Sequence, residues 1–188
     1  MSFAVCQRPR NAAATRGAIL DAASKRFTAE SYDQVGMRDI ARDVGVDPAL
    51  ISRYFGSKED LFRAVIDDCG SGKDITEGDR ATFGERMADE IVYGERNDSK
   101  LAWLLLMLRS ASSPKATEVI NRACSEAFFD PFIQWMGGQD APVRVRIAAG
   151  LMMGLSVSRD LTELSMSPDE CERLKARIAS LLQGLVDE

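Results

Sequence analysis

The 188-residue sequence predicts an all-α fold of about nine helices, and three observations lead to that prediction. Apolar residues recur at spacings of three and four along most of the chain, which is the period of an amphipathic helix. Residues suited to helix starts, such as Asp47-Pro48, and to helix ends, such as Gly45, separate these segments. No segment shows the sustained two-residue alternation of a strand between turn signals.

The first part of the chain is predicted to form four short helices. Gly45 should end the second abruptly, because glycine readily adopts a positive φ. Asp47 is a good N-cap for the third, and Pro48 suits its first helical position. Ser57 should cap the fourth, where Asp60 stands in place of the glutamate of a full capping box. The helices are expected over residues 13–29, 37–44, 48–55 and 57 to about 69.

A glycine-rich stretch at residues 70–78 reads as a linker, since it lacks the residue spacing of a phosphate-binding loop. Beyond it, Ser167-Pro168-Asp169-Glu170 is a full capping box. We therefore expect a smaller helical domain at residues 13–70 and a larger helical domain at residues 71–188. The helices of the larger domain are expected near residues 79–94, 98–111, 114–136, 140–163 and 168–186.

The residue types present exclude several kinds of chemistry. The chain has no histidine, which rules out Ser-His and Cys-His catalytic pairs and histidine metal sites. An acidic cluster at Glu85, Asp89 and Glu90 lies at helical spacing on a charged face, where a solvated surface is expected rather than acid-base catalysis. We expect no enzymatic activity, no metal and no cofactor.

Compartment and redox state can be inferred from the N-terminus and the cysteines. The basic residues near the N-terminus follow a short apolar patch, unlike those of a signal peptide. The longest strictly apolar run, Leu101 to Leu108, is too short to cross a bilayer. Cys6, Cys69, Cys124 and Cys171 form no CxxC motif. We therefore expect a cytoplasmic protein with no membrane partner and reduced thiols, with a redox-sensing cysteine pair as the alternative.

Residues 37–56 have the pattern of a helix-turn-helix motif, in which the second helix enters the major groove of DNA by its N-terminal residues. The small core of this motif is expected to contain Ile40, Ala41, Val44, Val46, Ile51 and Phe55. Polar and small apolar side chains on the exposed face can contact phosphates, base edges and thymine methyl groups. The predicted DNA-binding residues are Met37, Arg38, Pro48, Ala49, Leu50, Ser52, Arg53, Tyr54 and Lys58.

Residues 13–66 resemble the N-terminal domain of the TetR-type transcriptional regulators. The resemblance runs without a gap from about residue 13 to residue 66. It is carried by Ile19-Leu20-Asp21-Ala22-Ala23, Phe27, Tyr32-Asp33, Met37-Arg38-Asp39-Ile40-Ala41, Gly45-Val46, Ile51 and Tyr54-Phe55-Gly56-Ser57-Lys58-Glu59-Asp60-Leu61. This sequence differs from the family pattern at Arg26, Ser31, Gly36 and Ser52, where leucine, glycine, Ser or Thr, and tyrosine respectively are common.

The resemblance implies a three-helix DNA-binding domain followed by a ligand-binding and dimerisation domain. It further implies a homodimer that binds a palindromic operator and is usually released from DNA by a small molecule. We accordingly expect a repressor whose partners are double-stranded DNA, a small and largely apolar effector, and a second copy of the chain. The alternative is a helical scaffold for ligands or other proteins that binds no operator.

Large, soft apolar side chains in the larger domain are candidates for the wall of an effector pocket, because methionine and aromatic residues make adaptable contacts. Ordinary core packing is the alternative for each of them. The predicted pocket residues are Trp103, Met107, Phe128, Phe132, Trp135 and Met152.

The last two predicted helices are candidates for a dimer interface, as the resemblance also implies. Two glycines inside one helix cost helix stability, and close approach of a partner helix would explain them. The final helix is amphipathic, with apolar residues at spacings of three and four. Packing within one chain is the alternative. The predicted interface residues are Ile147, Gly150, Leu151, Gly154, Leu174, Ile178, Leu181 and Leu185.

The net charge of the whole chain, 24 − 29 = −5, argues against nucleic-acid binding at first sight, but the charge is unevenly distributed. Residues 1–66 carry 10 basic and 8 acidic side chains, a net charge of +2. Residues 67–188 carry 14 and 21, a net charge of −7. Arg8, Arg10 and Arg16 are further candidates for contact with flanking phosphates or the minor groove.

Overall fold

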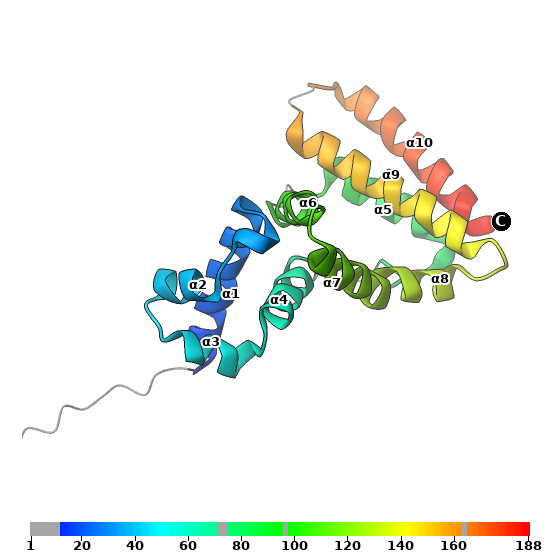
Figure 1. Ribbon diagram of the computed structural model, residues 1–188. Coiled ribbons are helices and arrows are strands. Elements are labelled where there is room, and N and C mark those ends of the chain that lie inside the picture. Colours follow the sequence, from blue (N-terminus) through cyan, green and yellow to red (C-terminus); the bar gives the residue numbers. More distant parts are fainter. Residues whose placement is uncertain (1–11, 71–74, 96–97, 163–164) are drawn as a thin grey trace, which may run out of the picture. The chain divides into compact units, whose positions relative to one another are not determined.

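A computed structural model of the chain describes residues 12–70, 75–95, 98–162 and 165–188 (Figure 1). Its contacts divide the chain into two units. The first unit comprises residues 1–68 and 103–120, and the second comprises residues 69–102 and 121–188. In the described residues, every regular element is a helix, so the prediction of an all-α fold is confirmed. No helix in these residues has the length and apolar character needed to span a bilayer.

The first unit contains the predicted helix-turn-helix motif and the helices that support it. Its elements are α1 (Ala12–Ala29), a 3-10 turn (Tyr32–Gln34), α2 (Met37–Val44), α3 (Pro48–Phe55) and α4 (Lys58–Gly70), most of α6 (Asp98–Ser110) and the start of α7 (Pro114–Cys124). The α6–α7 turn is joined to the 3-10 turn by a hydrogen bond of 3.0 Å from Ser113 Oγ to Asp33 Oδ1. A core of apolar residues from α1 and α4 surrounds the rings of Phe27 and Phe62, which lie 4.8 Å apart.

The second unit is built around the contact between α5 (Phe83–Tyr93) and α10 (Pro168–Asp187). Their close approach requires a glycine, since a Cβ at Gly84 would overlap the carbonyl oxygen of Ala179 and lie 2.8 Å from Gln183 Cβ. A 3-10 turn (Arg80–Thr82) precedes α5. The unit also contains a π-helical segment (Ser125–Phe129), α8 (Asp130–Met136) and α9 (Ala141–Leu161). The buried core contains Phe83, Ala88, Ile91, Phe132, Met136, Ala141, Val145, Ala148, Ile178, Leu182 and Val186.

Helix boundaries agree with the sequence prediction to within a few residues, with two differences in local form. The predicted helix at 114–136 is continuous, but its middle is π-helical over Ser125–Phe129. The predicted helix at 79–94 begins as a 3-10 turn, and its α-helical part starts at Phe83. With α7, the π segment and α8 counted as one helix, the described residues form nine helices, as predicted.

Three arginines provide hydrogen-bond donors to helix C-termini in the second unit, where the last carbonyls of a helix lack partners of their own. Arg80 donates to the carbonyls of Trp135, Met136 and Val186 at 2.6–3.0 Å. The buried Arg144 donates to Leu185 at 2.8 Å and to Gly137 at 2.5 Å. Arg159 donates to the carbonyls of Glu90, Ile91 and Gly94 at 2.8–3.1 Å. The ends of α5, α8 and α10 are thus fixed by guanidinium groups.

Replacement of Arg144 by methionine should destabilise the protein strongly. Methionine fills much of the same space but leaves the carbonyls of Gly137 and Leu185 without a buried donor. We expect the free energy of unfolding to fall by about 3 kcal/mol, the range for loss of charged hydrogen bonds. Urea unfolding followed by circular dichroism measures this. The matched control is Arg173→Met on α10, where the arginine is exposed; an equal loss in both variants would contradict the capping role.

Candidate DNA-binding surface

The turn between α2 and α3 is fixed by Gly45, which adopts φ 72° and ψ 35°. A residue with a side chain is strained in this left-handed region, whereas glycine is not. The Gly45 N–H donates to the carbonyl of Arg42 at 3.2 Å, and the Val46 N–H donates to that of Ala41 at 3.0 Å. These bonds satisfy the end of α2 and turn the chain sharply, as the sequence predicts.

The N-terminus of α3 is capped as expected. Asp47 Oδ1 accepts a hydrogen bond from the Ala49 N–H at 2.7 Å, and Pro48 occupies the first helical position. Ile51 on α3 is fully buried, as are Ile40 and Ala41 on α2, so the opposite face of α3 is open to solvent. Of the predicted contact residues on α3, Pro48, Ala49, Ser52 and Arg53 are exposed, and Leu50 and Tyr54 are half-buried.

The N-terminus of α4 is closed by a capping box in which aspartate replaces glutamate. The Ser57 N–H donates to Asp60 Oδ2 at 3.0 Å, and the Asp60 N–H donates to Ser57 Oγ at 3.1 Å. The hydrogen bonds from the Ser57 hydroxyl and N–H lower the pKa of Asp60. Asp60 therefore takes the part that glutamate plays in a full capping box.

The remaining predicted contact residues lie on α2 and α4. Arg38 is exposed and Met37 is half-buried at the start of α2. The Lys58 ammonium lies 4.2 Å from the centre of the Tyr32 ring, and burial lowers its pKa. Arg16 stacks 4.7 Å from the centre of the Phe55 ring, whereas Arg8 and Arg10 lie outside the described residues.

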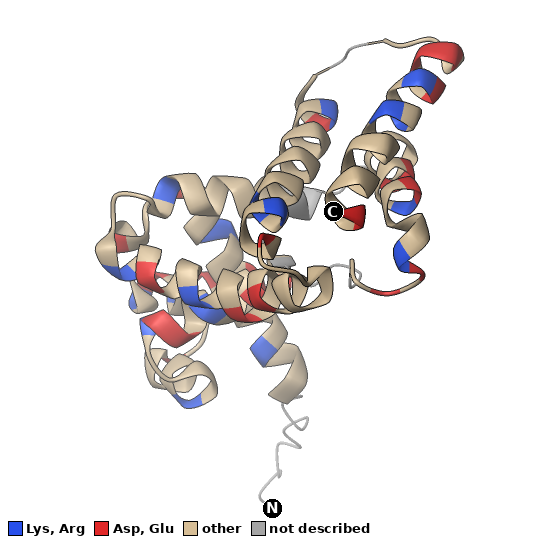
Figure 2. Cartoon of the chain, turned by 90° about the vertical axis from the view of Figure 1, so that its right-hand side faces the viewer, with Lys and Arg blue, Asp and Glu red and all other residues tan. Residues whose placement is uncertain are grey.

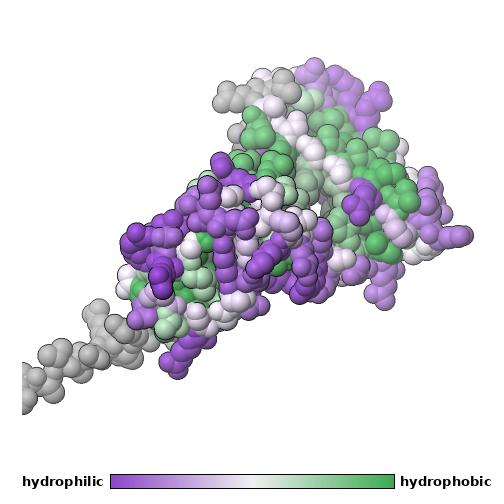
Figure 3. Space-filling model, viewed as in Figure 1, coloured by the Kyte–Doolittle hydropathy of each residue, from purple (hydrophilic) through white to green (hydrophobic). Residues whose placement is uncertain are grey.

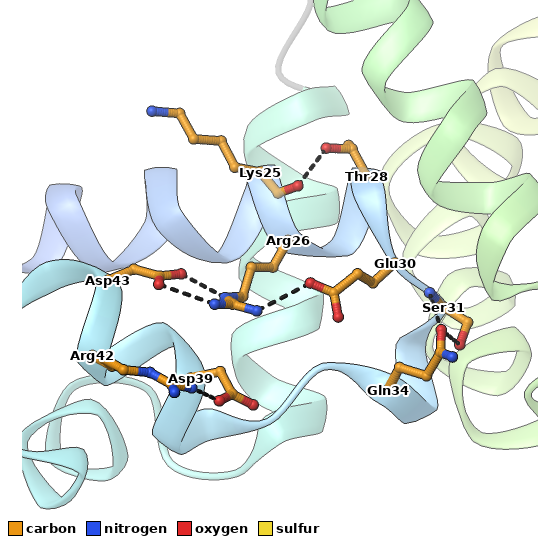
Figure 4. A network of polar contacts seen from close by, with 9 residues as sticks. All are labelled: Lys25, Arg26, Thr28, Glu30, Ser31, Gln34, Asp39, Arg42 and Asp43. Carbon is orange, nitrogen blue, oxygen red and sulfur yellow. Dashed lines mark hydrogen bonds and ion pairs between the residues drawn. The ribbon is translucent and has the colours of Figure 1, made fainter.

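Arg26 links α1 to α2 at a position where the sequence departs from the family pattern (Figure 4). Its guanidinium donates to both oxygens of Asp43, at 2.5 and 3.0 Å, and to Glu30 at 3.0 Å. The hydrogen bond from Arg26 lowers the pKa of Asp43. Asp39 and Arg42 form a further ion pair on α2. The first helix of the motif is therefore tied to α1 by charge as well as by apolar packing.

The predicted pocket residues belong to both units of the chain. Trp103 and Met107 belong to the first unit, whereas Phe128, Phe132, Trp135 and Met152 belong to the second. Phe132 is fully buried within the core, with its ring centre 5.7 Å from that of Phe83. Phe128, Trp135 and Met152 are partly buried against this core.

The second unit has a surface hollow of about 740 Å³ between the α7–α8 helix and α9, formed mostly by residues that the sequence analysis did not select. No local sequence signal marks them, since they meet only through tertiary packing. Arg146 lies 5.1 Å from the Phe129 ring centre at this hollow. The lining residues are Asn121, Cys124, Ser125, Phe129, Asp130, Ile133, Pro142, Val143, Arg146 and Ile147.

The predicted dimer residues divide between the surface and the core. Ile147, Gly150 and Gly154 on α9 are exposed, as is Leu181 on α10, at 61%. Leu151, Leu174 and Leu185 are half-buried against the core. Ile178 is only 3% exposed and belongs to the core of the unit. The amphipathic pattern locates an apolar face of α10 but does not distinguish its core side from an outer side.

The residues that the structure describes contain neither a cluster of metal ligands nor a disulfide. No three potential ligands among Cys, Asp and Glu residues lie close enough there to hold a metal ion. Cys69, Cys124 and Cys171 form no disulfide with one another, and Cys6 lies outside the described residues.

Two helices joined by a sharp glycine turn, with the second helix capped and exposed, are the arrangement of the helix-turn-helix class of DNA-binding proteins. Residues 19–65 match the family described as "Bacterial regulatory proteins, tetR family". Residues 81–186 match "Tetracyclin repressor-like, C-terminal domain". The chain belongs to the TetR family of DNA-binding transcriptional regulators, which are regulators rather than enzymes.

Individual relatives support this assignment. The chain is 30% identical over 149 residues to the HTH-type transcriptional activator FasR of Mycolicibacterium smegmatis, covering 73% of this chain and 67% of FasR. It is 23% identical over 183 residues to an uncharacterized HTH-type transcriptional regulator of Haemophilus influenzae, covering 91% and 88%. The fold is similar to that of NalD from Pseudomonas aeruginosa, with a TM-score of 0.66, 20% identity, and coverage of 90% and 96%.

Replacement of Asp43 by asparagine should lower the thermal midpoint by a few degrees at pH 7, because it breaks the bidentate bond to Arg26. The lowered pKa of Asp43 means that the ion pair stabilises the fold above the ordinary carboxyl pKa of about 3.9 and is lost as the pH falls through the lower folded value. The difference from wild type should therefore shrink below about pH 4. Differential scanning calorimetry measures it, with Asp67→Asn, in a pair local to α4, as the control.

Removal of positive charge near α3 should weaken DNA binding. We expect Arg53→Ala to reduce affinity about tenfold, in the range for loss of one base or phosphate contact.

Lys58→Ala should weaken binding to all sequences and reduce the slope of log affinity against log salt by about one. Fluorescence anisotropy at several salt concentrations measures both. Arg63→Ala, which removes an arginine paired with Asp67, is the control; an unchanged slope in Lys58→Ala would remove Lys58 from the phosphate contacts.

Proposed function

We propose that the protein is a repressor that binds a palindromic operator as a homodimer and is released by a small, largely apolar ligand. The observation that carries this proposal is the exposed N-terminal face of α3, held by the Gly45 turn and the Asp47 cap. Such a helix presents its first turns to the major groove. Ser52 and Arg53 are the polar groups of α3 that we assign to phosphates or base edges.

Homodimer formation is supported by apolar surface on the last two helices. Leu161 on α9 and Leu181 on α10 are large apolar side chains with more than half of their area exposed. Helix-turn-helix proteins commonly read two half-sites one turn of DNA apart, which requires two copies of the recognition helix. A dimer would supply the second copy and cover this apolar surface.

Effector binding is supported by the soft apolar side chains of the second unit. Phe128, Trp135 and Met152 are partly buried, so a ligand could contact them without dismantling the core. The ligand would act by binding one spacing of the two recognition helices more tightly than the other. Residues 68–69, 102–103 and 120–121 connect the two units, so α4, α6 and α7 are the segments through which such a change would pass.

The relatives named above differ in the direction in which they regulate transcription. NalD is described as a secondary repressor of the MexAB-OprM multidrug efflux pump, whereas FasR is named as an activator. We propose repression for this chain, because occupying an operator is sufficient to block transcription. A helical scaffold that binds no operator is the second candidate, and a gel shift with promoter DNA distinguishes the two.

Genomic footprinting with the purified protein should recover operators made of two inverted half-sites, with centres separated by about one helical turn of DNA, roughly 34 Å. Reporter transcription from such an operator should rise when the gene for the protein is deleted. A fall in transcription would identify an activator instead. Protection of single half-sites, or of no site, would contradict the proposed dimeric regulator, and the genes next to the operators would indicate which effectors to test for release.

A further inference from the structure

A π-helical turn forms part of the wall of the surface hollow between the α7–α8 helix and α9. The turn spans Ser125–Phe129, and Pro131 follows it closely. Proline has no N–H to donate to the carbonyl four residues before it, and its ring clashes with that carbonyl, so regular α-helix is disfavoured just ahead of Pro131. π-helical turns inside α-helices occur frequently at functional sites. The hollow has a volume of about 740 Å³, within the usual range for small-molecule sites.

The π-helical turn places a polar pair on this wall. Its hydrogen bonds join residues five apart, and the Asp130 N–H donates to the carbonyl of Ser125. The side chains of the same two residues also meet, since the Ser125 hydroxyl donates to Asp130 Oδ1 at 3.2 Å. Both residues line the hollow, and Asp130 is exposed. One carboxylate therefore stands at the open side of the hollow.

Arg146 supplies the positive charge of the hollow. Its guanidinium carbon lies 5.1 Å from the centre of the Phe129 ring, which is close enough for a cation–π interaction. Arg144 and Arg159, the other basic residues of α9, donate to backbone carbonyls. Among the residues that the structure describes, Arg146 has neither a hydrogen-bond acceptor nor a paired carboxylate. Its N–H groups are therefore open to a ligand.

Much of the remaining wall is apolar. It includes Ile133 on α8, with Pro142, Val143 and Ile147 on α9. Val143 is 54% exposed and Ile147 is 47% exposed. Figure 2 shows the basic and acidic residues of α9 confined to its two ends, and Figure 3 shows hydrophobic residues gathered over this helix. A ligand held by Arg146 would therefore meet apolar surface beside its charged group.

We propose that this hollow binds a small molecule that combines one carboxylate with an apolar body. The carboxylate accepts two hydrogen bonds from Arg146, because a guanidinium offers its donors as a planar fork that matches a carboxylate. The apolar body covers Ile133 and Val143. A phosphate ester is disfavoured, because its second negative charge is repelled by Asp130.

This site is separate from the effector contacts proposed above. Those contacts were assigned to Phe128, Trp135 and Met152, and none of the three lines this hollow. The inference does not rest on release of the protein from DNA by an effector. Failure of either proposal leaves the other in place.

Three matched naphthalene compounds test the chemistry of the site. 2-Naphthoate carries one carboxylate, 2-naphthalenemethanol carries no charge, and 2-naphthyl phosphate carries close to two charges at neutral pH. Isothermal titration calorimetry on the full chain gives each dissociation constant. We expect 2-naphthoate to bind about tenfold more tightly than either of the others, in the range for charged hydrogen bonds. Equal binding of 2-naphthoate and the alcohol, or tighter binding of the phosphate, would overturn the proposed carboxylate site.

Substitution of Arg146 locates the binding. Arg146→Gln should weaken 2-naphthoate binding about tenfold and leave the affinity for the alcohol unchanged, so that the advantage of the carboxylate disappears. Arg173→Gln, at an exposed arginine on α10, is the matched control and should retain the advantage. A carboxylate advantage that persists in Arg146→Gln would place the charged contact elsewhere and overturn the proposal.

Substitution of Asp130 tests the selection against phosphate. Asparagine can still accept the hydrogen bond from Ser125 but carries no negative charge. In Asp130→Asn we expect the affinity for 2-naphthyl phosphate to rise several-fold, and by more than the affinity for 2-naphthoate. Equal changes for the two compounds would overturn the role assigned to Asp130.

Discussion

The backbone carbonyls at the ends of helices impose the constraint on which the second unit depends. In an all-α chain every helix ends in carbonyls that its own residues cannot satisfy. Arg80 and Arg144 each reach the ends of both α8 and α10, and Arg159 reaches the end of α5. Because a guanidinium offers its donors in a fixed plane, each of these arginines determines where the helix ends can lie as well as satisfying them.

In the DNA-binding motif, short side chains and a glycine satisfy the unpaired backbone groups at the helix ends. Asp47 closes α3, and Ser57 with Asp60 closes α4. Gly45 closes α2 through its own backbone. None of these caps uses a long basic residue, so Arg38 and Arg53 remain on the surface. The local capping chemistry therefore leaves the positive charge near α3 available for DNA.

The features that the sequence predicts well are those set by near neighbours. The cap at Asp47, the turn at Gly45 and the capping box at Ser167 and Glu170 depend on residues within four positions of one another. The contacts of Arg26 with Asp43 and of Arg144 with Leu185 could not be predicted, because these partners are 17 and 41 residues away in the sequence. Periodicity also selects Phe132 and Ile178 as pocket and interface candidates, and the chain itself buries both side chains. Periodicity identifies an apolar face, but only tertiary packing shows whether the chain itself covers it.

Glycine shows most clearly what the three-dimensional structure adds. In the sequence, Gly84, Gly150 and Gly154 are alike, because each lies inside a predicted helix. In the structure, Gly84 is required by the carbonyl of Ala179, whereas Gly150 and Gly154 face open space. A glycine whose cost in helix stability is repaid inside the chain needs no partner. Gly150 and Gly154 have no such compensation within one chain, and this supports the homodimer proposed above.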